Sequence, residues 1–552
     1  MTTGQRNFWN GEAQDAPIPI KTPASEELPN KKFEFNWGIL AGTLLLVAMI
    51  VCAVVLNLIH GHTGDNAANV AGTVNIDNGD ININWERYPS YEVELSDTYT
   101  ITTSGTYYLS GEISDGGIII NATKEDVVRL VLNNVSIKNS SGPTIACYTA
   151  DDLVIELNGV NYLEDGAKYD VSLDEDVDGV IYSKSDLAFT GDGALTIKAN
   201  HGDGIVSKDD LTFRNGTYNI TAADDAIRGK DSVHISNGTF NIASSADAVK
   251  SNNDTDTTKG FILIEDGNLA IKASGKGIKA TNSIIIYGGN FDIVSVDDSI
   301  HSNNYVGITN GDIKISSSDD GIHADARLIV DGGKINITKS YEGLEAQKIS
   351  INAGEISVFS NDDGMNAGGG ADSSSQNRAG ANPFAANENC ELVINGGSIY
   401  VNAAGDGIDS NGWLYFNGGN VVVDGPTNNG NGALDSGAGI VMNGGTVVAV
   451  GASGMAESLG NTSSVYNVSI YFTSTLAKGT EVTILDVNGD TIISHTSAKT
   501  FSHLAAGSSK FKAGETYYIY VDGGVYQSFT ISSITTTVGN GGNMMMNAGQ
   551  RR

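Results

Sequence analysis

Short apolar stretches alternate with polar turns along most of this chain. Residues 239–242 (TFNI) and 312–315 (DIKI) place an apolar residue at every second position, which is typical of a strand with one buried face. A glycine precedes each of these stretches, and a second short apolar strand, such as 328–330 (LIV), precedes the glycine. The pattern therefore predicts units of about three short strands separated by turns.

A four-residue motif marks each unit and returns about every 22 residues, as in 203–206 (DGIV), 225–228 (DAIR) and 247–250 (DAVK). A fixed period of this length is typical of one structural unit stacked many times. At ~3.3 Å per residue, one unit forms a closed loop of roughly 70 Å circumference. We therefore predict an all-β fold, a parallel β-helix. The leucine-rich-repeat signature is missing, and propeller blades are longer than this period.

One segment is apolar enough to cross a membrane. Residues 37–59 form a run of 23 residues without a charge, long enough for a transmembrane helix. Lys31 and Lys32 precede the run, and no Lys or Arg follows it until Arg87. The positive-inside rule then places residues 1–36 in the cytoplasm and the repeats outside. A cleaved signal peptide is the alternative, but the apolar run is longer than an ordinary signal core.

The rest of the chain divides by composition. We expect a linker at 60–84, the parallel β-helix at 85–464, a small β subdomain at 465–535 and a disordered Gly/Met-rich tail at 536–552. The coils over 92–175 are less regular, and the segments 251–259 and 367–388 each lengthen one coil. The Asn488-Gly489 pair predicts a hairpin turn in the C-terminal subdomain.

The charge balance narrows the function classes. With 65 acidic and 32 basic residues, the net charge of −33 argues against nucleic-acid binding, which needs a basic surface. The acid excess fits either the solubility of a secreted protein or a set of sites for hard cations. Three cysteines, widely spaced, predict neither a disulfide scaffold nor a zinc site; Cys147 and Cys390 are expected to be buried thiols.

The first residue of the motif should form a column of carboxylates, because adjacent coils lie ~4.8 Å apart. Carboxylates that close together repel one another unless a cation joins them, and Ca²⁺ accepts irregular sets of oxygen ligands. The alternative is that Asp-Gly only makes a turn. The predicted calcium ligands are Asp224, Asp225, Asp297, Asp298, Asp319, Asp320, Asp362, Asp363, Asp406, Asp409 and Asp435.

The strongest part of this prediction is the C-terminal cluster. Asp362 and Asp363 should lie one coil before Asp406 and Asp409, across the long insertion. Asp435 should lie one coil after them, stacked on Asp409. Five carboxylates in three coils favour a bound cation over a simple turn.

The fourth residue of the motif forms a second column, which should point outward because side chains alternate along a strand. This column could bind a polyanion such as a polyuronide, or it could pair with the neighbouring aspartates. Exposed aromatic residues such as Tyr341 and Trp413 could stack on sugar rings or simply pack. The predicted ligand-binding residues are Arg228, Lys250, Lys279, His301 and His323, after which the column continues as Glu345, Asn366 and Asp409.

Several segments resemble one family. The coils DDGIHAD (319–325), DDAIRGKD (224–231) and GDGIDSNG (405–412), together with ITTSGTYYLSG (101–111) and SSKFKAGETYYIY (508–520), are similar to bacterial carbohydrate-binding β-helix domains related to a clostridial cellulose- and pectin-binding protein. The resemblance covers roughly residues 85–535. It implies a right-handed parallel β-helix of the pectate-lyase type, with calcium along one face, that binds rather than cleaves.

Pectate lyases of this shape use an Asp cluster for calcium and a Lys or Arg as the base. The cluster of Asp362, Asp363, Asp406 and Asp409 looks similar to that calcium site. The following coils, residues 419–445, contain no lysine or arginine, and the nearest downstream is Lys478. This departure favours binding over cleavage.

These observations lead to three hypotheses. The first is a monomeric, single-pass cell-membrane protein whose extracellular β-helix binds plant cell-wall polysaccharide, acidic pectin or cellulose, with Ca²⁺. The second is a calcium-dependent polyuronide (pectate) lyase, although no catalytic residue can be assigned among so many aspartates. The third is a structural or adhesive surface protein stiffened by calcium.

Overall fold

The computed structural model describes residues 83–170, 176–368 and 386–540. In these ranges the chain forms a parallel β-solenoid of the right-handed type with about 14 turns, which confirms the predicted fold class. The short 3-10 helix Trp85–Arg87 precedes the first strand. No helix within the described ranges is long and apolar enough to cross a membrane. The predicted transmembrane helix at 37–59 lies outside these ranges, as do residues 1–36 and most of the linker, the 367–388 insertion and the tail.

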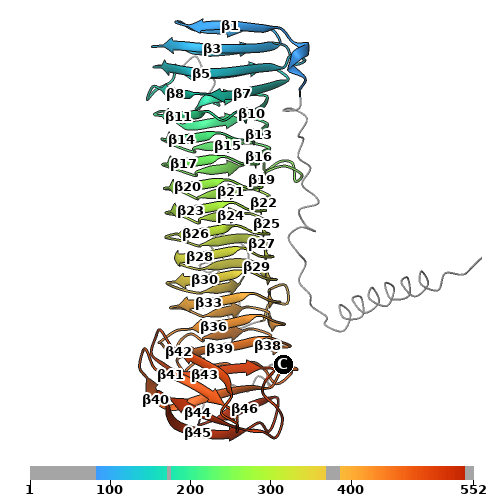
Figure 1. Ribbon diagram of the computed structural model, residues 1–552, viewed down its shortest axis with the longest axis vertical. Helices are drawn as coiled ribbons and strands as arrows, with labels where there is room; N and C mark the ends of the chain where they lie inside the picture. Colours follow the sequence, from blue (N-terminus) through green and yellow to red (C-terminus); the bar gives the residue numbers. More distant parts are fainter. Residues whose placement is uncertain (1–82, 171–175, 369–385, 541–552) are drawn as a thin grey trace, which may run out of the picture. The chain divides into compact units, whose positions relative to one another are not determined.

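Each regular coil contributes three strands, and each strand pairs in parallel with its counterpart in the next coil (Figure 1). Three parallel sheets therefore run along the stack of coils. The sheet that carries the four-residue motif is called the motif sheet, and the other two are called the second and third sheets in chain order. The third sheet contains the longest strands of a regular coil.

The strands of the motif sheet are β9 (Gly179–Ser183), β12 (Asp203–Ser207), β15 (Ile227–Gly229), β18 (Val249–Ser251), β21 (Ile278–Ala280), β24 (Ile300–Ser302), the first parts of β27 (Ile322–Val330) and β29 (Leu344–Ile351), β31 (Met365–Ala367), β34 (Ile408–Ser410) and β37 (Leu434–Ser436). Those of the second sheet are β7 (Asp152–Asn158), β10 (Asp186–Thr190), β13 (Asp210–Phe213), β16 (Ser232–Ile235), β19 (Phe261–Ile264), β22 (Ser283–Ile286), β25 (Tyr305–Ile308), the ends of β27 and β29, β32 (Glu391–Ile394), β35 (Trp413–Phe416) and β38 (Gly439–Met442).

The strands of the third sheet are β8 (Val160–Asp165), β11 (Ala194–Ala199), β14 (Thr217–Ala222), β17 (Thr239–Ser244), β20 (Asn268–Ala273), β23 (Asn290–Ser295), β26 (Asp312–Ser316), β28 (Lys334–Lys339), β30 (Glu355–Ser360), β33 (Ser398–Ala403), β36 (Asn420–Asp424) and β39 (Thr446–Gly451). The first coils contain β1 (Ser90–Leu95), β2 (Tyr99–Ile101), β3 (Gly105–Ile113), β4 (Ile118–Asn121), β5 (Val128–Asn139) and β6 (Ile145–Thr149), which pair into the same stack.

The core consists of apolar side chains stacked on themselves from coil to coil. The third residue of the motif is buried in every coil, and Ile227, Val249 and Ile278 lie directly over one another in the strand register. Aromatic rings stack in the same way, with the centroids of Tyr218 and Phe240 4.8 Å apart. Such a core grows by repetition, so its length is not limited by the size of a single globular interior.

A column of glycines turns the chain into the third sheet. Gly267, Gly289 and Gly311 have φ values of 131°, 107° and 129°, which residues other than glycine rarely adopt. A Cβ atom on Gly289 would lie 3.0 Å from the backbone oxygen of Gly267 in the preceding coil. The glycine repeat in the sequence is thus required by backbone conformation and by close contact between coils.

The two interruptions of the period leave the stacking intact. Val249 pairs with Ile278 across the insertion at 251–259. Asn366 pairs with Asp409, so the coils on either side of the long insertion are direct neighbours, as predicted. Asp409 in turn lies over Asp435, which was also predicted.

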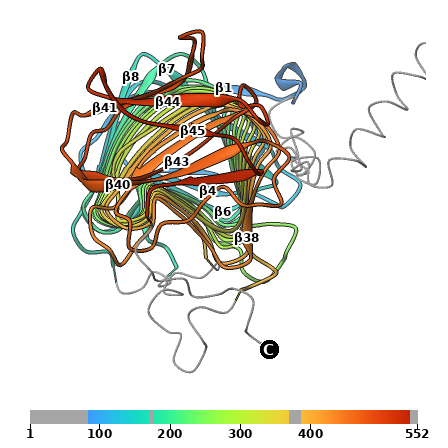
Figure 2. The ribbon, with the colours of Figure 1, turned by 90° about the horizontal axis from the view of Figure 1, so that it is seen from below.

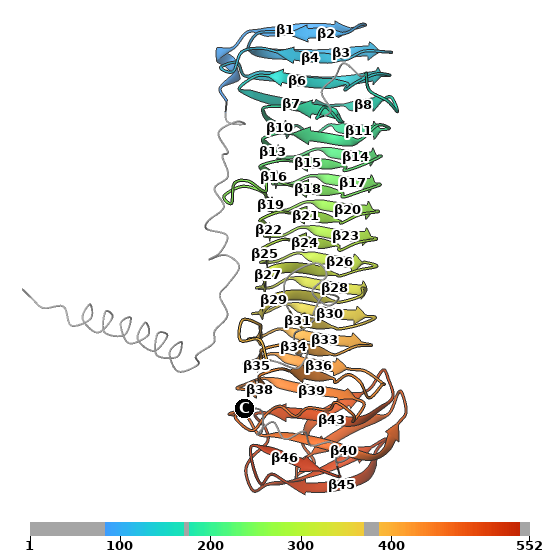
Figure 3. The ribbon, with the colours of Figure 1, turned by 180° about the vertical axis from the view of Figure 1, so that it is seen from behind.

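The C-terminal region forms mainly antiparallel strand pairs beyond the last coil, and β40 and β46 pair in parallel. Strands β41 (Glu481–Leu485), β42 (Thr491–Thr496), β44 (Thr516–Val521) and β45 (Gly524–Thr530) make a four-stranded antiparallel sheet, and β40 (Asn467–Leu476), β43 (Phe501–Ser508) and β46 (Thr535–Val538) extend the solenoid (Figures 2 and 3). Strand β43 pairs in antiparallel fashion with β39 of the last coil. The predicted hairpin at Asn488-Gly489 is confirmed, because β41 and β42 pair across it.

Candidate functional site

The acidic column of the motif sheet is a hydrogen-bonded ladder. In successive coils, Oδ1 of Asp203 accepts a hydrogen bond from the backbone N–H of Asp225 at 2.9 Å, and Oδ1 of Asp225 accepts one from Asp247 at 3.0 Å. The same contact recurs from Asp298 to Asp320 at 3.0 Å. One oxygen of each of these carboxylates is therefore used to join neighbouring coils, which is a structural role that the sequence did not reveal.

The second oxygen of these carboxylates meets a cationic side chain of the protein. Oδ2 of Asp203 accepts a hydrogen bond from Nε of Arg228 at 2.6 Å. Nζ of Lys250 lies 3.0 Å from Oδ2 of both Asp225 and Asp247. The pairing between the two columns was one of the two alternatives for the basic residues, and the geometry shows it for Arg228 and Lys250.

Lys276 takes the place of an aspartate in the acidic column. Its Nζ lies 2.6 Å from Oδ2 of Asp298 and 2.9 Å from Oδ1 of Asp297, and its side chain is buried. Burial raises the pKa of Asp298, but the hydrogen bond from His301 and the charge of Lys276 lower it well below its usual range. A buried carboxylate is stable here because it is paired.

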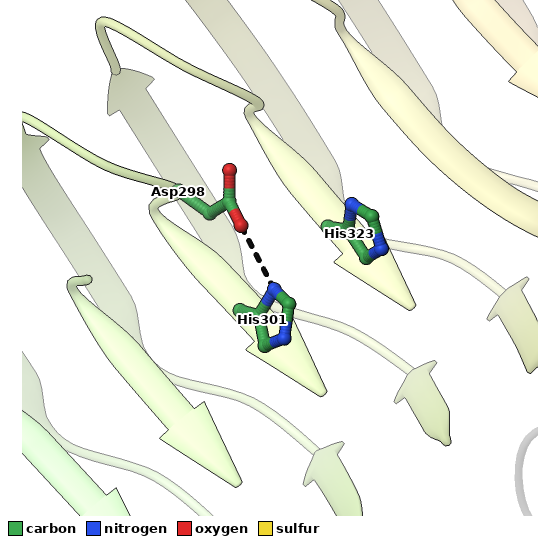
Figure 4. Close-up of side chains that lie close together, drawn as sticks. All are labelled: Asp298, His301 and His323. Carbon is green, nitrogen blue, oxygen red and sulfur yellow. Dashed lines mark hydrogen bonds and ion pairs between the residues drawn. The ribbon is translucent and has the colours of Figure 1, made fainter. Parts of the chain in front are cut away.

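His301 and His323 stack in register, with their ring centroids 4.8 Å apart (Figure 4). Nδ1 of His301 lies 2.8 Å from Oδ2 of Asp298. Nδ1 of His323 lies 2.8 Å from Oε2 of Glu345 and 3.3 Å from Oδ2 of Asp320, and its Nε2 lies 3.2 Å from Oδ1 of Asp325.

Both histidines are buried, although the alternation of side chains predicts that this column points outward. Their exposed fractions are 3% for His301 and 0% for His323. The rings do leave the apolar core, but neighbouring residues of the same column and the acidic column cover them. Burial lowers the pKa of His323, and hydrogen bonds with Asp320, Asp325 and Glu345 outweigh it and raise the pKa to about 12. His323 is therefore a cation that neutralises part of the ladder.

The other predicted residues of the first coils differ in exposure. Lys279 is half-buried and lies between Lys250 and His301 in the strand register. Asp224 and Asp319 are exposed, while Asp297 is half-buried and paired with Lys276. Some of these residues belong to groups of three carboxylates whose oxygens lie within 4.8 Å of one another. One group is Asp203, Asp224 and Asp225, and another is Asp297, Asp298 and Asp319. Their role as calcium ligands stays a prediction.

The ladder changes character after His323, because the second column becomes acidic or neutral. Oδ1 of Asp363 accepts a hydrogen bond from the backbone N–H of Asp406 at 2.6 Å, so the coil-joining contact continues. Burial and the repulsion of Asp406 raise the pKa of Asp363 to about 8. Burial and the charges of Asp435 and Asp362 raise the pKa of Asp406 to about 7, although a hydrogen bond from the backbone N–H of Gly432 lowers it.

Glu457 belongs to this group and was missed by the sequence reasoning. It lies after the last regular coil, and burial together with the charges of Asp435 and Asp406 raises its pKa to about 8. No motif marks Glu457, because the chain reaches the cluster from outside the repeat. We call Asp362, Asp363, Asp406, Asp409, Asp435 and Glu457 the C-terminal acidic group.

The C-terminal acidic group fits a hard cation by its chemistry. Its donors are all carboxylate oxygens, and burial together with the charges of neighbouring carboxylates raises the pKa of Asp363, Asp406 and Glu457. Calcium is held by such oxygens and tolerates irregular geometry. The group is not among the triads whose ligand atoms lie within 4.8 Å of one another in the described residues, so its carboxylates would have to draw together around an ion.

A lysine from the C-terminal region also reaches these coils. Nζ of Lys499 donates hydrogen bonds to the backbone oxygens of Ala403 and Gly425, and burial lowers its pKa to about 8. Nearby, Nε2 of His495 lies 2.8 Å from Oδ1 of Asp424. These contacts fasten the C-terminal region to the third sheet. Lys499 is thus a downstream lysine that contacts the coils next to the acidic group.

Part of the solenoid is similar to known proteins. Residues 96–364 match the family of carbohydrate-binding domain-containing proteins. The resemblance stated from the sequence is thereby confirmed. A carbohydrate-binding domain-containing protein of Acetivibrio thermocellus is 34% identical over 126 residues, which are 22% of this chain and 44% of that protein. The chain thus spans less than half the length of this relative.

A solved structure is also similar. The polysaccharide lyase-like protein from C. thermocellum, determined as a gadolinium derivative, is 27% identical, with a TM-score of 0.37. The match covers 44% of this chain and 96% of that one.

Proposed function

We propose that this chain binds polysaccharide through its β-solenoid, outside the cell, and that Ca²⁺ at the C-terminal acidic group takes part in binding. The observation that carries the proposal is the match of residues 96–364, nearly all of them solenoid coils, to the carbohydrate-binding domain family. The ligand class we propose is plant cell-wall glycan, acidic pectin or cellulose.

The charge pattern of the ladder supports a role for calcium at one end. From Asp203 to Asp298 the buried carboxylates meet Arg228, Lys250, Lys276 and His301. Burial raises the pKa values of Asp203 and Asp225, and the charges of Arg228 and Lys250 act to lower them. For Asp363 and Asp406, the charges of neighbouring aspartates instead add to the effect of burial and raise the pKa further. A divalent cation would remove this repulsion, and a polyuronide carboxylate could complete its coordination.

The membrane attachment of the proposal rests on the sequence. Residues 37–59 are uncharged and long enough to span a bilayer, with Lys31 and Lys32 on one side. We propose that this segment anchors the protein and that the solenoid faces the cell exterior.

Affinity electrophoresis of the full chain in a non-ionic detergent tests the proposal. The gels would contain polygalacturonate or hydroxyethyl cellulose, with added calcium or with a chelator. We expect at least one polysaccharide to retard the protein, and we expect retardation by polygalacturonate to need calcium. If no polysaccharide slows migration while the chelator lowers the melting temperature, the solenoid is a calcium-stiffened structural element instead.

A further inference from the structure

A shallow trough lies on the outward face of the third sheet. Its lining residues belong to β11, β14, β17, β20, β23 and β26, which are neighbours in Figure 1. It consists of two hollows of about 520 and 340 Å³ that share Asn241, Ala270 and Asp292. The floor is low because Ala243 and Ala270 stand where neighbouring strands carry larger side chains. Six strands at ~4.8 Å spacing give the trough a length of roughly 24 Å, enough for several sugar rings.

The trough is lined by groups that hydrogen-bond to hydroxyls. Asn241 donates to Oδ1 of Asn219 at 2.9 Å, and Asn290 donates to Oδ1 of Asn268 at 3.0 Å, so these amides are held in fixed orientations. An amide has two N–H donors and two acceptor lone pairs, so each keeps capacity for a ligand. The side chain of Val294, which is 44% exposed, adds an apolar contact at the edge.

The formal charges of the lining cancel. Lys272 and Lys314 stand against Asp292 and Asp312, and Nζ of Lys314 lies 3.1 Å from Asp292. The whole chain, by contrast, carries a net charge of −33. A surface with balanced charge and many amides and hydroxyls suits an uncharged, hydroxyl-rich chain better than a polyanion.

The residues that match the carbohydrate-binding family include the trough but not most of the C-terminal acidic group. The matched residues, 96–364, include every residue that lines the trough. They end before Asp406, Asp409, Asp435 and Glu457. The part of the chain that is similar to carbohydrate-binding proteins therefore contains the whole trough but only the beginning of the acidic group.

We propose that the trough on the third sheet binds a neutral polysaccharide chain lying along the stack of coils, without calcium. This proposal rests on the proposed function and names a second binding surface and its ligand class. Recognition comes from the amides of Asn219, Asn241, Asn268 and Asn290 and from the flat floor at Ala270.

The test fills the floor of the trough with the Ala270→Trp variant. The control is Ser398→Trp, an exposed outward position on β33 of the same sheet, beyond the residues that line the trough. The full chain, in detergent and chelator, would be measured by retardation in hydroxyethyl cellulose gels. We also include Asn241→Ala, because it removes hydrogen bonds without adding bulk.

We expect Ala270→Trp to abolish retardation. Asn241→Ala should raise the dissociation constant about tenfold, because it removes roughly one to two hydrogen bonds to the ligand. Ser398→Trp should migrate like the wild type. The trough proposal would be overturned if Ala270→Trp were retarded as strongly as the wild type. It would also be overturned if polygalacturonate were the only polysaccharide that retarded the wild type. The proposed function would survive both results. Retardation by no polysaccharide would instead overturn the proposed function and the trough with it.

Discussion

Oδ1 of Asp363 accepts a hydrogen bond at 2.6 Å from the backbone N–H of Asp406, a residue 43 positions later in the sequence. The contact joins two neighbouring coils across the long insertion. It also places two half-buried carboxylates next to each other. Burial and the charge of Asp406 raise the pKa of Asp363, and burial and the charges of Asp435 and Asp362 raise the pKa of Asp406. The same contact that holds the coils together therefore creates the electrostatic strain that a cation can relieve.

We predict that Asp363→Asn has opposite effects with and without calcium. The amide oxygen of Asn can still accept the hydrogen bond of Asp406, so the substitution removes mainly the charge. In chelator at pH 8, the loss of repulsion should raise the melting temperature by about 1–3 °C. In millimolar calcium the variant should gain less stability from the ion than the wild type.

Thermal unfolding of both proteins in both conditions measures this effect. Asp292→Asn is the matched control, because Asp292 is exposed on the third sheet, away from the acidic group. Equal calcium-dependent shifts in wild type and Asp363→Asn would contradict the proposed role of Asp363.

Lys276 should be far more important for stability than an exposed lysine. Removing it leaves Asp298 buried beside Asp297 without their ammonium partner. We expect Lys276→Met to lower the free energy of unfolding by about 3–5 kcal/mol, the usual cost of breaking a buried ion pair. Lys314→Met, which breaks an exposed pair with Asp292, should cost about 0–1 kcal/mol. Denaturant unfolding that gave similar values for the two variants would show that Lys276 does not neutralise the ladder.

The contribution of His323 to the free energy of unfolding should decrease as the pH rises. Its pKa is raised to about 12 in the folded protein, above its ordinary value of 6.5. The stabilisation is therefore complete below about pH 6.5 and decreases as the pH rises toward the folded pKa, because the unfolded chain no longer binds the proton.

His323→Gln should accordingly destabilise the protein most near pH 6 and least near pH 10. The measurement is the difference in unfolding free energy between wild type and variant across this range. His234→Gln is a control, because burial lowers the pKa of His234 instead. A difference that grew with pH would contradict a cationic His323.

Most of the fold could be predicted from the sequence because the repeat is expressed in residues that the coil requires. Ile227, Val249 and Ile278 occupy one stacked core position, and Gly289 and Gly311 adopt backbone conformations that favour glycine. Such local requirements appear in the sequence at a fixed spacing. The stacking of Asp435 on Asp409 followed from the same spacing.

The site was less predictable because burial and charge compensation depend on neighbouring coils. His301 and His323 point away from the core, as alternation requires, yet the columns around them exclude solvent. Glu457 and Lys499 come from outside the repeat, so no period indicates them. The hydrogen bonds of the aspartate ladder were also missed, because an Asp at a turn has the same sequence signature whether it binds backbone or metal.

The most direct test of a calcium site at the C-terminal acidic group is calorimetric titration of the full chain with CaCl₂ in detergent. The wild type is compared with the double variant Asp363→Asn/Asp406→Asn, and Asp292→Asn/Asp312→Asn on the third sheet is the matched control. We predict that the wild type and the control bind calcium and that the double variant loses at least one site. Equal binding by all three proteins, or no binding by the wild type, would contradict a calcium site at Asp363 and Asp406.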